Sequence, residues 1–162
     1  MTALPKETTA QLLSTAEVAG MMGVETDWIE WIQHYRSERG IDWIYQGINR
    51  LETYWTPSGI EKLMLALCNR HFPRLEWEKQ DGTCWDSVMD CQESWLRLRL
   101  HQHSLCWKAE LSAHKAVYAQ NMPGVCKISL FEHKAPTPNA ALSALADAWK
   151  PAWEAMRPTG GD

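Results

Sequence analysis

The stretch STAEVAGMMGVETDWIEWI, residues 14–32, decides the fold that we expect for this chain. Ser14 and Glu17 have the spacing of a capping box, in which the two side chains bond unpaired backbone N–H groups at the start of a helix. Gly23 is expected to end that helix, because glycine adopts the positive φ of a tight turn. A second helix is expected from Glu25 to Ser37.

The residues that follow predict a β-hairpin and then a third helix. Apolar and polar residues alternate in IDWIYQ (41–46), GINR (47–50) supplies a turn, and LETYW (51–55) predicts the returning strand. Thr56 is a suitable helix cap before Pro57, and HFPR (71–74) ends the third helix.

Beyond residue 73 the sequence predicts mixed strands and helices. WLRLRLHQH (95–103) alternates strictly, as in a half-buried strand, and VCKISLF (125–131) predicts another strand. SLCWKAELSAHKAVYAQN (104–121) fits a helix capped by Ser104. A last amphipathic helix is expected from about Asn139 to Met156, interrupted at Pro151.

Small, glycine and apolar residues recur in register through the first two expected helices. This pattern, with the hairpin after it, resembles over residues 12–70 the helix-turn-helix of MerR-type and excisionase-type regulators, which often read T-x-E-V-A-x-x-L-G-V-S-x-x-T-I-R-x-W. The resemblance implies that the hairpin is a wing. The residues that carry it are Val18, Ala19, Met22, Gly23, Val24, Ile29 and Ile32.

We therefore expect an α+β fold class: an N-terminal winged helix-turn-helix, then a small mixed α/β region with a C-terminal helix. Residues 1–11 and 157–162 are expected to be flexible tails. Residues 12–72 would form the winged domain, and residues 74–156 a dimerisation or effector region.

The resemblance also implies a DNA-binding surface, because in those families the second helix enters the major groove and the wing contacts the backbone. Asp27 and Glu30 depart from the basic or polar residues usual there, and carboxylates are repelled by phosphates. Residues 1–70 hold six Lys and Arg against nine Asp and Glu. The candidate DNA-binding residues are Thr26, Trp28, Trp31, His34, Arg36, Arg39, Asn49 and Arg50.

Trp28 and Trp31 leave a different class of partner open. If both point outward, they form an apolar patch of the kind that marks a protein-binding site. If one or both pack against the hairpin near Trp43 or Trp55, they are core residues, and we favour this for one of the pair.

Composition restricts the partners and the compartment. The net charge of the 162 residues is -4, so DNA binding would need a local basic patch. No apolar run is long enough to span a membrane, and the N-terminus lacks a secretory signal. The five cysteines are most simply free thiols in a reducing compartment, so we expect a cytoplasmic protein.

No motif predicts an enzyme or a cofactor. Walker, G-x-G-x-x-G and G-x-S-x-G sequences are all missing, so we expect neither catalysis nor a bound cofactor. One cluster of cysteines and histidines contains the residue types that bind zinc, but it lacks a C-x-x-C pair. We therefore favour buried thiols and surface imidazoles with no bound metal. The members of the cluster are Cys84, Cys91, His101, His103 and Cys106.

Two hypotheses about function follow. The leading one is a cytoplasmic transcription regulator of the phage or mobile-element kind that binds double-stranded DNA as a homodimer. The alternative is a winged-helix module that binds a protein through its acidic, Trp-bearing second helix, as an adaptor, a DNA-packaging component or an inhibitor.

Overall fold

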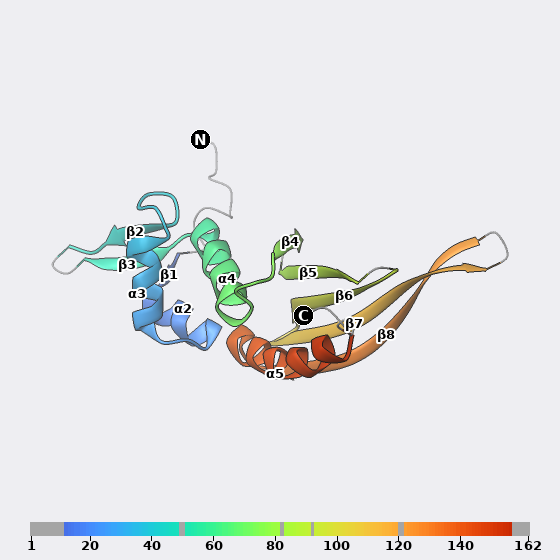
Figure 1. The fold of residues 1–162 in the computed structure, drawn as a ribbon. Coiled ribbons are helices and arrows are strands. Elements are labelled where there is room, and N and C mark those ends of the chain that lie inside the picture. Colours follow the sequence, from blue (N-terminus) through green and yellow to red (C-terminus); the bar gives the residue numbers. More distant parts are fainter. Residues whose placement is uncertain (1–11, 49–50, 82, 92, 120–121, 157–162) are drawn as a thin grey trace. The chain divides into compact units, whose positions relative to one another are not determined.

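The described residues fold mainly as two antiparallel sheets, of three and five strands, accompanied by four helices (Figure 1). The computed structural model describes residues 12–48, 51–81, 83–91, 93–119 and 122–156. The expected fold class is therefore wrong. The chain is sheet-rich, and no N-terminal winged helix-turn-helix is evident in the part of the chain that the structure describes. The apolar spacing of residues 14–32 determines local helices, but it carries no information about the sheets that organise the chain.

Two short helices form where the first stretch predicts them. Helix α2 (Thr15–Met22) begins with the capping box, since the Glu17 N–H donates to Ser14 Oγ and the Ser14 N–H donates to Glu17 Oε1. Gly23 ends it with a φ of 76°. Helix α3 (Thr26–Tyr35) follows and ends earlier than expected.

A three-stranded sheet in the order β1-β3-β2 accompanies these helices. Strands β2 (Trp43–Gln46) and β3 (Glu52–Trp55) form the expected hairpin. Strand β1 (Leu13–Ser14) pairs with β3, a pairing that no local pattern in residues 13–14 predicts. Trp55 is fully buried, and its indole N–H donates to Thr15 Oγ1 over 3.2 Å.

Helix α4 (Pro57–His71) begins as expected, with the Gly59 N–H donating to Thr56 Oγ1. The chain divides into two compact units, residues 1–67 and 68–162, and the division falls within α4.

The second unit is a five-stranded antiparallel meander in the order β4-β5-β6-β7-β8. Its strands are β4 (Glu78–Asp81), β5 (Cys84–Cys91), β6 (Ser94–His103), β7 (Cys106–Ala119) and β8 (Met122–Ala135). The helix expected over residues 104–121 is wrong, because β7 occupies most of this range. The expected strands at 95–103 and 125–131 lie within β6 and β8.

Helix α5 (Pro138–Met156) packs on β6, β7 and β8, and it continues through Pro151, where an interruption was expected. Alternate residues of β6 and β7 are buried with the apolar face of this helix: Leu96, Leu98, Leu100, Ala109, Leu111, Ala141, Leu142 and Leu145. The opposite face of β6 and β7 carries charged residues, namely Arg97, Arg99, Lys108 and Glu110. None of the described helices combines the length and the hydropathy that crossing a membrane would require.

Candidate DNA-binding surface

The C-terminal end of α3 presents a cluster of exposed aromatic and basic side chains. Trp31 is 47% exposed and Tyr35 is 72% exposed, and their ring centroids lie 5.6 Å apart. The Arg36 Cζ atom lies 5.7 Å from the Trp31 ring centroid. We call Trp31, Tyr35 and Arg36, together with the neighbouring Arg39 and Tyr45, the α3 surface.

The other two residues of the α3 surface are Arg39, in the loop after α3, and Tyr45, on strand β2. The Arg39 Cζ atom lies 4.9 Å from the Tyr45 ring centroid, and Tyr45 packs edge-on against the buried Trp43 at 5.0 Å. Arg39 also forms an isolated β-bridge with Trp43. Cation–π contacts of this kind orient the guanidinium plane over the ring.

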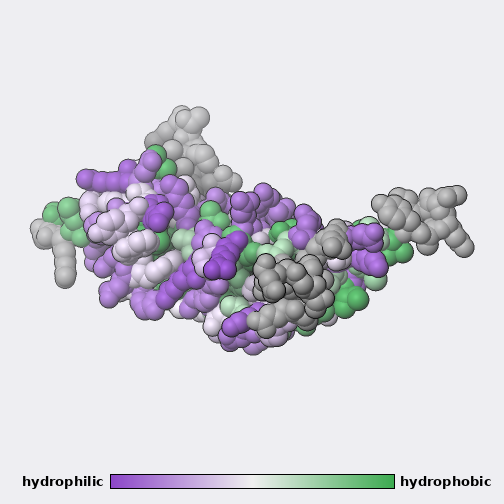
Figure 2. Space-filling view, in the orientation of Figure 1, coloured by the Kyte–Doolittle hydropathy of each residue, from purple (hydrophilic) through white to green (hydrophobic). Residues whose placement is uncertain are grey.

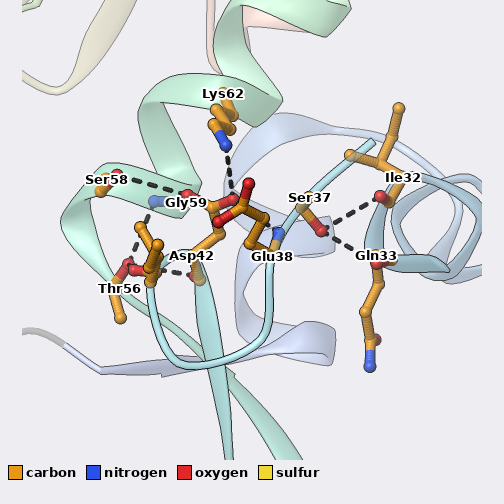
Figure 3. A network of polar contacts seen from close by, with 10 residues as sticks. Ile32, Gln33, Ser37, Glu38, Asp42, Thr56, Ser58, Gly59 and Lys62 are labelled. Carbon is orange, nitrogen blue, oxygen red and sulfur yellow. Dashed lines mark hydrogen bonds and ion pairs between the residues drawn. The ribbon is translucent and has the colours of Figure 1, made fainter. Parts of the chain in front are cut away.

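A polar network holds the loop that carries both arginines (Figure 3). The Ser37 hydroxyl donates to two carbonyls in the last turn of α3, those of Ile32 and Gln33, at 3.1 and 3.0 Å. One residue further on, the Glu38 N–H donates to Asp42 Oδ2 over 2.8 Å. The loop is therefore fixed to the helix on one side and to Asp42 on the other.

Asp42 is a fully buried carboxylate that links this loop to α4. Lys62 Nζ donates to Asp42 Oδ2 over 2.7 Å, and the Ser58 hydroxyl donates to Oδ1 over 3.3 Å (Figure 3). Burial would raise the pKa of Asp42, but the hydrogen bonds from Lys62 and the Glu38 N–H outweigh it, so the pKa lies below its ordinary value.

The charges of the α3 surface are not neutralised by acids. Within the described residues, neither Arg36 nor Arg39 forms an ion pair, whereas the guanidinium of Arg99 in the second unit is bound by Asp86 at 2.9 and 3.1 Å. Exposed, unneutralised guanidinium groups are suited to phosphate or carboxylate ligands. Asp27 and Glu30 remain exposed on the same helix, and both would repel phosphates.

The residues predicted for the site differ in their exposure to solvent. Thr26, Trp31, His34, Arg36 and Arg39 are all exposed. Trp28 is half-buried, whereas Asn49 and Arg50 lie outside the described residues.

Tyr35 and Tyr45 belong to the surface, but the sequence did not single them out. The one signal that could have found them is spacing. Tyr35 follows Trp31 by four residues, which places both on one helix face. Tyr45 follows Trp43 by two residues, which places both on one strand face.

Part of the cysteine–histidine cluster of the second unit is brought together by strand pairing, since Cys84 lies opposite His101 and His103 lies opposite Cys106. Among the described residues, no three His, Cys, Asp or Glu side chains are grouped in a way that could hold a metal ion. Burial raises the pKa of the Cys84 thiol to about 11, and the negative charge of Asp86 adds to the shift. Such a thiol is protonated and a poor ligand at neutral pH.

A buried contact in the second unit joins a serine to a histidine, two of the residue types that nucleophilic catalysis uses. Ser112 Oγ lies 2.8 Å from His114 Nε2, and Trp95 stacks on the His114 ring at 5.4 Å. Burial lowers the pKa of His114, and the positive charges of Arg97 and Lys127 lower it further. No carboxylate bonds His114 within the described residues, so an orienting acid is missing.

No protein-family model, no curated protein and no solved structure matches this chain.

Proposed function

We propose that this chain is a DNA-binding regulator that holds duplex DNA through phosphate contacts of Arg36 and Arg39. One observation carries the proposal: both guanidinium groups are exposed, lie over aromatic rings and have no acidic partner within the described residues. A guanidinium plane fixed over a ring keeps its N–H donors at its edge, where they can bond phosphate oxygens. Thr26 and Trp31 lie on the same helix and would approach the groove.

In this proposal the regulator works in the cytoplasm, as a homodimer and without catalysis. The free thiols of Cys68, Cys84, Cys106 and Cys126 support a reducing compartment. The phage or mobile-element character rests on the MerR and excisionase resemblance, which stays a prediction. Because the fold class implied by that resemblance is wrong, DNA binding is argued from the charges of the α3 surface alone.

The salt dependence of binding to random duplex DNA tests the proposal. The full chain is titrated into a labelled duplex at several salt concentrations, and the affinity is read from fluorescence anisotropy. Each phosphate contact contributes a slope of about -0.9 to the plot of log affinity against log salt. Arg36→Ala and Arg39→Ala should therefore each weaken binding and make the slope shallower by about 0.9.

Arg74→Ala is the matched control. It removes the same charge from an exposed position in the second unit, so it should leave the slope of the wild-type chain unchanged. Absence of binding by the folded wild-type chain at low salt would overturn the DNA proposal. An unchanged slope in both arginine variants would remove the α3 surface from it.

A protein partner is the second candidate, favoured by the exposure of Trp31 and Tyr35. Trp, Tyr and Arg are the residues most enriched where protein partners bind tightly, and the exposed acids Asp27 and Glu30 do not oppose such a partner. This candidate predicts a protein that co-purifies with the wild-type chain and is lost with Trp31→Ala and Tyr35→Ala. Duplex DNA would then bind neither wild type nor variant. A partner retained by both variants would exclude the α3 surface as its site.

A further inference from the structure

Strand β8 forms a long, exposed edge of the five-stranded sheet. It contains 14 residues and, among the described residues, pairs only with β7, whereas β4 at the opposite edge contains four. Val125, Ile128 and Leu130 on β8 are 60%, 57% and 46% exposed. Figure 2 shows hydrophobic surface along the part of the β7–β8 hairpin that extends beyond β6. An exposed edge of this length is a template for pairing with another strand.

A β-bulge changes which side chains share a face of this edge. Leu111 pairs with Phe131 and Ser112 pairs with Ser129, so Leu130 is an extra residue in β8. Lys127 and Glu132 pair with His114 and Glu110, which are four residues apart on β7 and so lie on one face of the strand. Lys127 and Glu132 therefore lie on the same face of the sheet, although five consecutive steps of a regular strand would place them on opposite faces.

The same bulge places Ile128 and Phe131 together on the other face. These residues pair with Ala113 and Leu111, which are alternate positions of β7. Each face of β8 thus holds a pair of residues placed symmetrically about the point midway between Ser129 and Leu130. One face holds a lysine and a glutamate, and the other holds two large apolar side chains.

This arrangement is complementary to itself when the strand direction is reversed. If a second β8 runs antiparallel to the first with its Glu132 opposite Lys127, the two-fold axis also places its Lys127 opposite Glu132. Ile128 then lies opposite Phe131 twice, and Ser129 lies opposite Leu130 at the centre. Opposite charges and apolar pairs directly across an antiparallel ladder are stabilising.

We propose that a second copy of this chain pairs antiparallel with β8 and joins the two five-stranded sheets edge to edge. The strand pairing satisfies edge N–H and C=O groups, and the Lys127–Glu132 contacts, formed twice, select the register. Glu132 already lies 3.0 Å from Lys108 but is 46% exposed on its side chain, so it can accept a second lysine. This interface does not depend on the function of the α3 surface.

Charge reversal across the interface tests the proposal by sedimentation of the full chain over a range of concentrations. The wild-type chain should dimerise. Lys127→Glu and Glu132→Lys should each weaken the dimer at least about tenfold, because either change places like charges opposite each other twice. An equimolar mixture of the two variants should form a heterodimer of near wild-type affinity, because both contacts again join opposite charges.

Lys115→Glu is the matched control, since it makes the same charge change at an exposed position on β7, away from the free edge. It should dimerise as the wild-type chain does. A wild-type chain that stays monomeric overturns the proposal and leaves the edge to a different partner. A dimer that Lys127→Glu does not weaken, or monomeric single variants that do not associate when mixed, would also overturn it. Circular dichroism of Glu132→Lys checks that loss of its Lys108 contact leaves the chain folded.

Discussion

Asp42 connects several segments of the first unit, and no local pattern in the sequence predicts these contacts. Its carboxylate holds the Glu38 N–H, Lys62 and Ser58, while its backbone carbonyl accepts the Thr56 N–H. These bonds join the loop after α3 to the start of α4. The alternation around residues 41–46 predicts a strand there, but it cannot show that this aspartate is buried with a lysine from twenty residues later.

Asp42→Asn should destabilise the first unit and flatten its response to acid. The folded pKa of Asp42 lies below the ordinary 3.8, so its stabilisation is present above that value and is lost as the pH falls through the lower folded pKa. We expect a loss of about 2 kcal/mol in the free energy of unfolding near neutral pH. Urea titrations from pH 7 to pH 2 measure both effects.

The control is Asp27→Asn, at an exposed carboxylate in the first turn of α3. Its effect should stay below about 1 kcal/mol, the usual contribution of an acid at a helix N-terminus. If the two variants lose equal stability, the buried network of Asp42 does not contribute as we argue.

Two glycines of the first unit should respond to alanine in opposite directions. A Cβ at Gly59 would overlap the Asp42 carbonyl oxygen and lie 2.9 Å from the Trp55 ring, whereas a Cβ at Gly20, inside α2, meets nothing within 4 Å. Gly59→Ala should therefore cost about 1–3 kcal/mol. Gly20→Ala should add about 0.5–1 kcal/mol, because alanine is the better helix former. Thermal unfolding followed by circular dichroism distinguishes the two signs, and stabilisation by Gly59→Ala would show that α4 does not approach Asp42 so closely.

At the scale of single elements, local signals sufficed wherever they were chemically specific. The capping box of Ser14 and Glu17, the positive φ of Gly23 and the Thr56 cap are found as the sequence predicts. Strand β7 was missed because its buried face is formed by Ala109 and Leu111, and alanine is a strong helix former. Its pairing with β6 and β8 is a tertiary contact that overrides this propensity.

Because β7 is a strand and not a helix, two alanine positions along it should differ in their tolerance of a charged side chain. Ala109 and Ala116 are seven residues apart, so a helix would place them on one face, whereas β7 places them on opposite faces. Ala109 is fully buried, and Ala109→Glu should cost roughly 3 kcal/mol or more through an unpaired buried charge. Ala116→Glu, at a half-buried position, should cost much less. Equal losses in chemical denaturation would contradict the strand assignment.

At the scale of the molecule, the fold class could not be derived from residues 14–32. That stretch specifies two helices, but strand β1 beside it pairs with β3, and the meander of the second unit depends on the order in which β4 to β8 associate. Strands that pair in these sheets are distant from the helices in the sequence. The apolar spacing of a helix-turn-helix is compatible with several arrangements of such strands. The exposure of Arg36 and Arg39 was easier to predict, because charged side chains need only remain at the surface.

If β8 joins two copies, the stability of the whole molecule must depend on its concentration. Association of folded chains stabilises them by mass action, so the thermal midpoint of the wild-type chain should rise with protein concentration. The midpoint of Lys127→Glu should stay constant over the range in which it is monomeric, and Lys115→Glu should follow the wild type. Scanning calorimetry over about a hundredfold range of concentration, below and above the dissociation constant, measures these trends. A wild-type midpoint that does not change across this range would contradict pairing at β8, since an interface formed only between folded chains cannot leave their unfolding equilibrium unaffected.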